Sequence, residues 1–304
     1  MSELEIVDNL RARAAILPRT GVVAGIGDDC AVFRANAAED LLITSDMLLE
    51  GVHFHQGTHS AAALGRKALA RALSDIAAMG GRPRFCLLSL AAPGWADRRF
   101  LNGFYGGFLR FAGEMQLTLA GGDLARGGRL ACDVVVCGAV ERGKALRRNG
   151  ARPGDLIYVS GVLGGAALGL ERRRGPAWKR HRDPVPRLAL GEFLRRELRA
   201  TAAIDISDGL SIDLHRLAKE SSVAASLDSP LPVFHGASLD HVLHGGEDYE
   251  LLFTVRPRTA VPERHQGVPL TRIGVVRAGR PGVLELFGRP LAPLGYDHFR
   301  EKRG

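Results

Sequence analysis

Apolar runs of strand length recur along the first half of the chain, and helical patterns separate some of them. The runs are LLITS at 41–45, FCLLSLA at 85–91, LTLAGG at 117–122 and CDVVVCGAV at 132–140. Residues 61–80 place small and apolar side chains at helical spacing, and a Gly-Gly pair followed by Pro83 predicts where that helix ends. This half is therefore expected to mix strands with helices.

A second series of apolar runs begins after RRNGARPGD at 147–155, where glycines and a proline predict turns. The series comprises LIYVSG at 156–161, AAIDIS at 202–207, ELLFTV at 250–255, RIGVV at 272–276 and VLELF at 283–287. Helical patterns lie between these runs. We therefore predict an α+β or mixed α/β protein of two domains, residues 1–148 and residues 149–304.

Composition is typical of a folded chain. With 304 residues, 46% hydrophobic and 24% charged, the protein is long enough for one large domain or two ordinary ones. The first residues, MSELEIVDNLRARAAI, resemble a short amphipathic helix and lack the order of a signal peptide. No segment approaches the roughly 20 uninterrupted apolar residues of a membrane span. We expect a cytoplasmic protein that does not bind a membrane.

The cysteines give no sign of disulfides or of a zinc site. They stand at positions 30, 86, 132 and 137 and form no CxxC pair. Cys132 and Cys137 would point to opposite faces of the strand they share. We expect buried free thiols.

The formal net charge is +8, and the excess of basic residues is concentrated at 171–199, ERRRGPAWKRHRDPVPRLALGEFLRRELR. Such a stretch could form a nucleic-acid surface. No aromatic stacking ladder or groove-reading motif accompanies it, so a solvated helix and loop is the better interpretation. We expect no nucleic-acid partner. Whether the stretch also forms a lid over a nucleotide is left open.

Five short stretches share one local pattern, in which an aspartate follows apolar residues and lies beside glycine, serine or threonine. They are GIGDDC (Asp28, Asp29), LLITSDM (Asp46), ALSDIAAMGG (Asp75), LAGGDL (Asp123) and AIDISDG (Asp205, Asp208). Such positions end strands or helices, where the backbone can approach a ligand closely. Oxygen ligands without a histidine or cysteine cluster favour magnesium, which takes a few carboxylates together with substrate phosphates. If these acids share one site, the sequence predicts a magnesium- and phosphate-dependent enzyme.

Each of these aspartates also has a purely structural interpretation. Asp208 could cap the helix that follows it, and Asp75 could pair with Arg71, one helical turn earlier. Asp28, Asp29, Asp46 and Asp123 could form turns. Asp213, one turn into its helix, is expected to be solvated beside Arg216. A set of acids that all lie at element ends is explained better by one shared site than by independent caps.

The usual nucleotide-binding motifs are missing from the sequence. The glycine-rich SGVLGGAALGL at 160–170 follows a strand and opens a helix, but its spacing does not fit GxGxxG. No GxxxxGK[ST] sequence occurs in the chain. His53, in EGVHFH, has no HExxH or His–Cys spacing around it and is interpreted as a packed loop residue or a polar substrate contact. Any ATP would therefore bind without a P-loop or a protein-kinase signature.

Taken together, the motifs resemble the thiamine-monophosphate kinase family, of the superfamily shared with aminoimidazole ribonucleotide synthetase. The matching stretches, in family order from residue 25 to 299, are GIGDDCAVF, TSDMLLEGVHF, ALSDIAAMGG, GGDLARG, RRNGARPGDLIYVSG, AIDISDGLSIDL, HGGEDYELLFTV and GYDHF. The resemblance implies an N-terminal domain whose mixed sheet pairs with that of a second subunit in a homodimer. It also implies a C-terminal α/β domain, with the active site between the two domains.

The reaction implied by the resemblance transfers the γ-phosphoryl group of ATP to the phosphate of thiamine monophosphate, giving thiamine diphosphate and ADP. A phosphate monoester has a second pKa of about 6, so the acceptor is mostly a dianion at neutral pH and needs no general base. Positioning and cationic stabilisation supply most of the catalysis in phosphoryl transfer. Several Mg²⁺ ions are therefore expected, and no catalytic acid or base.

The resemblance also implies three groups of site residues. The metal ligands would be Asp29, Thr44, Ser45, Asp46, Asp75, Asp123, Asp205 and Asp208. ATP would contact Gly122, Asp123, Arg148 and Ser207, and thiamine monophosphate would contact His53, Glu247 and Tyr296. For Tyr296 a role as a C-terminal packing anchor is the alternative.

At two places the chain departs from the family pattern. Leu124 and Ala125 follow the GGD sequence, where hydroxyl residues are usual, and Gly165 and Ala166 stand where Asp-Ser is usual. Backbone N–H groups could serve in place of the missing side chains. Altered affinity is therefore expected, and not lost activity.

The alternatives are other members of the superfamily and one protein of a different class. Selenophosphate synthetase and the hydrogenase-maturation carbamoyl dehydratase use a reactive cysteine or selenocysteine near a chain end, where this sequence has neither. GGEDYELLF and GYDHF argue against aminoimidazole ribonucleotide synthetase. A non-catalytic nucleotide- or RNA-binding protein would use the basic stretch but would leave the aspartates unexplained.

Overall fold

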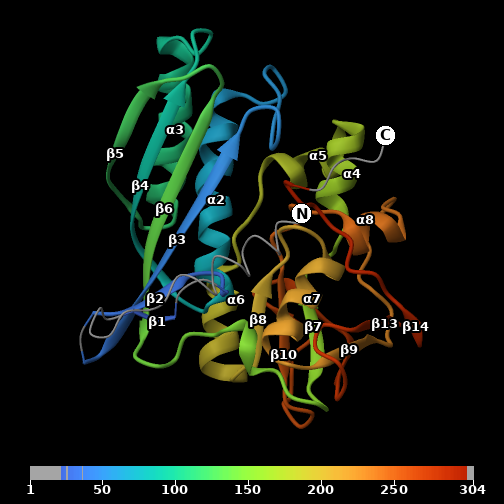
Figure 1. Cartoon of the computed structure of the whole chain (residues 1–304). Helices are drawn as coiled ribbons and strands as arrows, with labels where there is room; N and C mark the ends of the chain where they lie inside the picture. The colour runs from blue at the N-terminus through green and yellow to red at the C-terminus, as the bar shows by residue number, and fades with distance from the viewer. Residues whose placement is uncertain (1–21, 25–26, 36, 300–304) are drawn as a thin grey trace.

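The computed structural model describes residues 22–24, 27–35 and 37–299. The amphipathic helix expected at the N-terminus lies outside this part, as do Gly25 and Ile26 of the GIGDDC motif. Figure 1 shows two sheets, the first built from the blue-to-green part of the chain and the second largely from the yellow-to-red part. The predicted combination of mixed sheets with helices is confirmed. The domain boundary after residue 148 stays a prediction.

The first sheet has the strand order β1-β2-β3-β6-β4-β5 in the described residues. Its strands are β1 (Val22–Ala24), β2 (Ala31–Arg34), β3 (Glu39–Leu49), β4 (Arg82–Ala92), β5 (Thr118–Arg126) and β6 (Ala131–Glu141). Neighbouring strands are antiparallel except β4 and β5, which are parallel. Side chains of β3 and of the first half of β6 alternate between more buried and more exposed positions, so the sheet buries one face there.

Two long helices, α2 (Ala61–Ala78) and α3 (Arg98–Glu114), pack against the buried face of this sheet (Figure 1). Ser60 caps α2, since its hydroxyl accepts the N–H of Ala63 at 3.2 Å. The two helices cross closely at Gly65, where a Cβ would lie 2.0 Å from the carbonyl oxygen of Phe104. The chain leaves α2 through Gly80, whose φ of +67° suits glycine, so the predicted helix stop is confirmed.

Although α2 is rich in alanine and leucine, it carries a polar stripe along one side. Lys67, Arg71, Ser74 and Asp75 follow one another at helical spacing. The first three are buried, and Asp75 is half-buried. This stripe meets groups from both halves of the protein, because α2 packs against β3 and β6 and also against elements of the second half.

The second sheet has the order β14-β13-β9-β12-β7-β10-β8 in the described residues, with β11 paired to β12. Its strands are β7 (Leu156–Ser160), β8 (Ala202–Asp205), β9 (Ala224–Leu227), β10 (Leu251–Val255), β11 (Arg264–His265), β12 (Val268–Arg277), β13 (Leu284–Leu286) and β14 (Arg289–Pro290). It too is mixed, because β9 and β13 are parallel and the other pairs are antiparallel.

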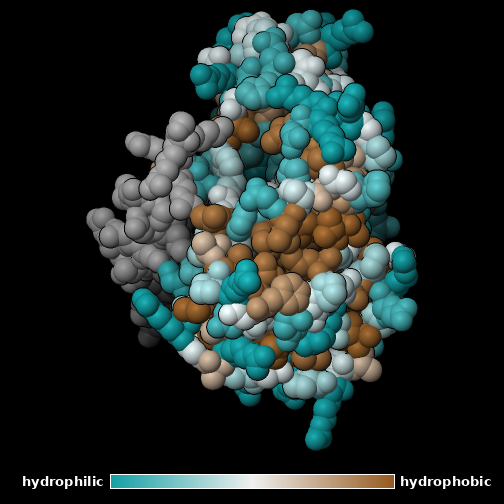
Figure 2. All heavy atoms as spheres, turned by 90° about the vertical axis from the view of Figure 1, so that its right-hand side faces the viewer, coloured by the Kyte–Doolittle hydropathy of each residue, from teal (hydrophilic) through white to brown (hydrophobic). Residues whose placement is uncertain are grey.

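Helical segments surround this second sheet. They are η1 (Arg148–Gly150), α4 (Gly165–Arg172), α5 (Gly175–Arg182), α6 (Leu188–Phe193), η2 (Leu194–Leu198), α7 (Leu210–Glu220) and α8 (Leu239–His244). Figure 2 shows the face that carries α8, with a broad hydrophobic patch at its centre and a hollow above it. No helix in the described ranges is both long enough and apolar enough to cross a bilayer.

The buried free thiols predicted for all four cysteines are confirmed. The basic stretch at 171–199 is helical, as expected, but it is more than a solvated surface. His181 is 1% exposed, and Arg187 donates from Nε to the buried Glu250 at 2.7 Å. This stretch therefore forms part of the packed second half.

Candidate active site

Three of the predicted metal ligands meet at one point between the two sheets. Asp29 precedes β2, Asp75 lies near the end of α2, and Asp205 ends β8. One carboxylate oxygen from each lies within 4.8 Å of the other two. Burial raises the pKa of Asp75 and of Asp205 well above the usual value, and the neighbouring carboxylates raise both further. Hard oxygen donors that repel one another at this distance fit a Mg²⁺ ion.

Hydrogen bonds orient these carboxylates. Thr44 on β3 donates from its hydroxyl to Asp75 at 2.5 Å. Ser74, on α2, donates to Asp205 at 2.7 Å. The second of these bonds joins the two halves of the protein, so the position of Asp205 beside Asp75 depends on how the halves pack.

Arg148 and Asp29 form a paired arrangement beside this cluster. The guanidinium donates from Nε and Nη2 to the two carboxylate oxygens at 3.0 and 2.9 Å. The carboxylates of Asp29 and Asp28 hold the pKa of Arg148 above its usual value in spite of burial. The predicted ATP contact thus lies next to the predicted metal ligands.

Asp46 lies on the cavity wall but has an arginine as its partner. Arg71 donates from Nε and Nη2 to the two oxygens of Asp46 at 3.1 and 2.9 Å. Burial raises the pKa of Asp46 although Arg71 opposes the shift. The alternative that Arg71 pairs with Asp75 is wrong, because the guanidinium reaches across to β3. Ser45 also lines the cavity, and its hydroxyl donates to Asp133 at 2.6 Å.

The expected solvation of Asp213 is wrong. Its side chain is fully buried, and Oδ2 accepts the backbone N–H groups of Ser207, Asp208 and Gly209 at 3.0 to 3.1 Å. The turn before α7 folds back so that these three donors converge on the first turn of the helix. Asp213 therefore does the capping that was considered for Asp208, and Asp208 faces the cavity paired with Arg216 at 2.5 Å.

Asp123 and Gly122 do not join the cluster within a single chain. The residues that pair across the sheet in one row are Met47 on β3, Asp133 on β6, Ser89 on β4 and Asp123 on β5. Three strand spacings of roughly 4.8 Å each separate Asp123 from β3. The side chain of Asp123 is exposed, and it accepts the N–H of Leu124 at 2.9 Å.

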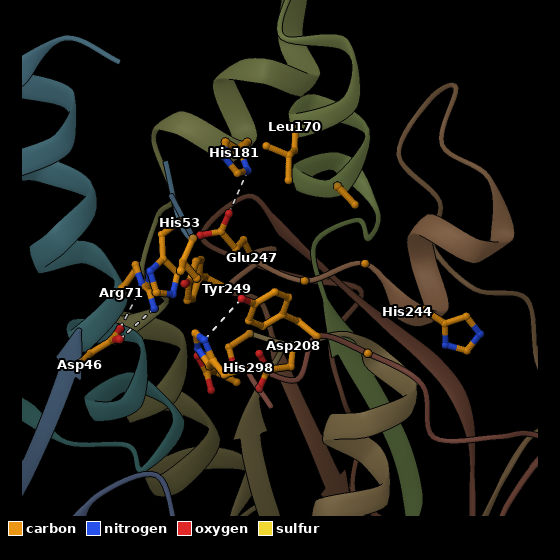
Figure 3. Close-up of a pocket in the computed structure, with 18 of the residues that line it drawn as sticks. Asp46, His53, Arg71, Leu170, His181, Asp208, His244, Glu247, Tyr249 and His298 are labelled. Carbon is orange, nitrogen blue, oxygen red and sulfur yellow. Dashed lines mark hydrogen bonds and ion pairs between the residues drawn. The ribbon is translucent and has the colours of Figure 1, made fainter. Parts of the chain in front are cut away.

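A cavity of about 540 Å³ extends from the acidic cluster. Asp46, Asp75, Asp205, Ser207 and Asp208 line it at one end. The predicted substrate contacts His53, Glu247 and Tyr296 also line it, together with Leu170, His181, Tyr249 and His298. Figure 3 shows Asp46 and Arg71 on one side and Glu247 below His181 on another. All three predicted substrate residues therefore share one cavity with most of the predicted metal ligands.

His53 is held as a neutral ring. Its Nδ1 accepts the N–H of Leu49 at 2.9 Å, which leaves the ring proton on Nε2. Burial and, to a smaller extent, the positive charge of Arg71 together lower the pKa of His53 to about 3. His53 is therefore suited to donate a hydrogen bond and unsuited to act as a general base.

Sequence reasoning missed two residues that contact Glu247. Lys67 on α2 lies 3.0 Å from Glu247 Oε1, and Nδ1 of His181 on α5 lies 3.0 Å from Oε2. Glu247 itself has a φ of +67°, a left-handed conformation that is uncommon outside glycine. A lysine aligned with Arg71 and Asp75 on an otherwise apolar helix was the signal in the sequence.

Backbone N–H groups at the two departures from the family pattern already have partners. The N–H groups of Gly164 and Ala166 donate to Asp248 at 2.6 and 3.0 Å. The N–H of Leu124 donates to Asp123. Neighbouring carboxylates occupy the N–H groups of Ala166 and Leu124 in this arrangement. The expectation that backbone groups replace the missing side chains stays a prediction.

The chain is similar to known proteins over nearly its whole length. Two family models match: AIR synthase related protein, N-terminal domain, over residues 27–140, and AIR synthase related protein, C-terminal domain, over residues 152–286. The thiamine-monophosphate kinase of Escherichia coli is 40% identical over 310 residues, covering 92% of this chain and 93% of that protein. The thiamine-monophosphate kinase of Bacillus subtilis is 32% identical over 328 residues, covering 99% and 100%.

A solved structure extends this similarity to three dimensions. AaThiL complexed with AMPPCP and TMP is 30% identical and has a TM-score of 0.86, covering 98% of this chain and 97% of its own. Similar sequence, fold and motif order over nearly the whole length lead to one conclusion: the chain belongs to the thiamine-monophosphate kinase family.

Proposed function

We propose that this protein transfers the γ-phosphoryl group of ATP to thiamine monophosphate and releases thiamine diphosphate and ADP. Family membership supports the proposal, since the relatives above are thiamine-monophosphate kinases. The observation that carries it is the shared cavity, in which Asp75 and Asp205 lie at one end and Glu247 lies farther along the wall. Its volume of about 540 Å³ is in the range that encloses small organic ligands.

The side chains present suit a reaction without a general base. His53 is neutral and carries its proton on Nε2, and Glu247 already contacts Lys67 and His181. Thiamine monophosphate, as a dianion, can attack the γ-phosphate directly once it is aligned. The protein would therefore contribute orientation and charge stabilisation, with in-line transfer as the expected geometry.

Asp29, Asp75 and Asp205 would hold Mg²⁺, with Thr44, Ser45, Asp46 and Asp208 as further ligands around the cavity. Bound there, Mg²⁺ would neutralise phosphate charge and stabilise the charge that develops on the transferred group. Arg148, which already lies beside Asp29, and Ser207 would contact ATP. The convergence of three carboxylates from separate elements supports this assignment.

We also propose a homodimer that forms through the first sheet. The face of this sheet turned away from α2 exposes apolar side chains: Ile43, Met47, Phe85 and Leu87 are 37% to 51% exposed. Strand β5 is exposed along nearly its whole length and pairs with β4 on one side. An apolar face next to an open strand edge suits sheet pairing with a second copy.

In such a dimer, Gly122 and Asp123 of one copy would reach the site of the other copy. Because Asp123 is far from the cluster within its own chain, it can act as a ligand if a second copy supplies it. A cytoplasmic location is proposed as well, since four free thiols suit a reducing compartment.

The first test is product formation. The purified protein is incubated with ATP and Mg²⁺ and with thiamine monophosphate, thiamine or an aminoimidazole precursor in parallel. Thiamine diphosphate formed from the monophosphate, with no product from the other two, is the expected result. No product from any acceptor, with ATP still bound, would show that this member of the superfamily uses another acceptor.

A further inference from the structure

An ion pair joins Glu247 on the cavity wall to Lys67 behind it, and the chemistry of phosphoryl transfer does not use this pair. The ammonium group of Lys67 is completely buried in α2, and its partner Glu247 has a side chain that is 18% exposed. A buried ammonium is costly unless it is paired. Lys67 is paired with Glu247 Oε1 at 3.0 Å and donates to Oε2 at 3.1 Å. The lysine thus contacts both oxygens of one carboxylate.

His181 contacts both members of this ion pair. Its Nδ1 lies 3.0 Å from Glu247 Oε2, and its Nε2 lies 3.3 Å from the ammonium of Lys67. A carboxylate accepts and an ammonium donates, so Nδ1 carries the proton and Nε2 accepts from Lys67. In this tautomer a neutral imidazole donates to Glu247 and accepts from Lys67. The ring is stacked on Trp178 with centroids 5.2 Å apart and planes 19° apart, which limits its rotation.

The result is a carboxylate fixed in place and kept ionised. Burial opposes the charge on Glu247, but Lys67, His181 and Arg71 together hold its pKa well below the usual range. Figure 3 shows the carboxylate of Glu247 beneath His181, with His53 and Tyr249 nearby. The cavity therefore presents one fixed anion among aromatic and imidazole rings, which suits a flat ligand with a positive charge.

We propose that Lys67 and His181 are positioning residues that hold Glu247 so that this end of the cavity selects a positively charged heteroaromatic ring. This inference rests on the proposed function, in which the ring is the thiazolium of thiamine monophosphate. Lys67 does not line the cavity, and His181, which does, is only 1% exposed. Lys67 and His181 affect selectivity for the ring through Glu247, while the acidic cluster binds the phosphates through Mg²⁺.

The test is a comparison of two ligands by isothermal titration calorimetry, without turnover. One is thiamine monophosphate, and the other is an isostere in which a neutral thiophene replaces the thiazolium. We expect the wild-type protein to prefer the charged ligand by about tenfold or more. The Lys67→Met and His181→Phe variants should lose most of this preference, and His181→Asn, which keeps a donor near the position of Nδ1, should recover part of it.

Steady-state kinetics distinguish a positioning role of Lys67 from a general loss of structure. The Lys67→Met variant should raise the KM for thiamine monophosphate about tenfold, while kcat at saturation and the Kd for ATP change by less than about threefold. Arg66→Met is the matched control, because Arg66 is next to Lys67 in sequence but lies over the ring of Phe111 and donates to the carbonyl of Pro184. Its ligand preference should equal that of the wild type.

Each outcome decides between the two proposals. If wild type makes thiamine diphosphate but binds both ligands equally, or if Lys67→Met keeps the preference, the inference about Lys67 and His181 is wrong and the kinase function stands. If wild type makes no thiamine diphosphate, the function fails, and the calorimetric comparison still decides the charge preference. If Lys67→Met does not fold, Lys67→Met/Glu247→Gln removes both charges, and it should bind both ligands equally.

Discussion

The hydroxyl of Ser74 on α2 donates to the carboxylate of Asp205 at the end of β8, over 2.7 Å. These residues are 131 positions apart in the chain and belong to different halves of the fold. Ser74 also precedes Asp75, so one turn of α2 supplies both a ligand candidate and the group that orients another. The acidic cluster is thus assembled when the two halves pack together.

The Asp205→Asn substitution should reduce kcat about a thousandfold or more while the fold stays intact. An amide of the same shape removes one charge from a cluster whose members repel one another, so the thermal midpoint without added metal should not fall. Steady-state kinetics and a melting curve measure the two effects. Asp240→Asn, at an exposed position on α8, is the control and should keep full activity. An active Asp205→Asn enzyme would exclude this residue from the site.

The Asp213→Ala substitution should lower the free energy of unfolding by about 2 to 4 kcal/mol. The reason is that one carboxylate oxygen accepts three backbone N–H groups before α7, and the other accepts from Arg216 at 2.9 Å. Urea denaturation measures the difference. A loss below about 0.5 kcal/mol would mean that water replaces the carboxylate and that the capping role is minor.

His53 predicts a specific pH dependence of stability. Its pKa is lowered from 6.5 to about 3 in the folded protein, so between these values the unfolded chain binds a proton that the folded chain does not. The resulting stabilisation is fully present above about pH 6.5 and is lost as the pH falls below it. The wild type should therefore lose stability relative to His53→Gln between about pH 7.5 and about pH 5. Denaturation at both pH values tests this, with the exposed His55→Gln as control; a constant difference would contradict it.

The proposed dimer predicts that two inactive variants complement each other. If a second copy supplies Asp123, a mixed dimer of Asp123→Asn and Asp205→Asn chains has one intact site. Unfolding and refolding an equal mixture should then restore about a quarter of wild-type activity, since about half the dimers are mixed. Light scattering checks the oligomeric state.

Leu87→Lys is the companion variant for the dimer. It places a charge on the exposed apolar face of the first sheet and should produce monomers with little activity. If the mixed chains show no recovery while Leu87→Lys is monomeric and active, Asp123 does not act across an interface.

The sequence was sufficient to predict every long strand and the main helix, because their apolar runs and glycine stops are local signals. It also predicted that Asp29, Asp75 and Asp205 share a site, since element ends and oxygen chemistry coincide there. It could not show which acids have arginine partners. The pairing of Asp46 with Arg71 depends on tertiary packing across 25 positions.

Two failures have a different physical origin. Asp213 looked like a surface residue because its spacing from Arg216 is typical of an exposed helical pair. The backbone N–H groups that it accepts belong to the turn before α7, and the sequence does not give the geometry of that turn. Lys67 was missed because an isolated lysine on a helix is usually solvated. Its place on the buried stripe becomes visible when the next three polar residues are considered together.

Helix α2 fixes the distance between the two ends of the proposed site. Lys67, which supports the ring-binding end, and Asp75, which belongs to the acidic cluster, are eight residues apart on one stripe, so about 12 Å of rigid helix separates them along its axis. The close crossing at Gly65 leaves this helix little freedom to shift. Under the proposed function, a ring beside Glu247 and a phosphate at the acidic cluster would be held at this separation. A ligand with a ring but no phosphate would then leave the acidic end unfilled, so the helix fixes the distance that a ligand must span between its ring and its phosphate.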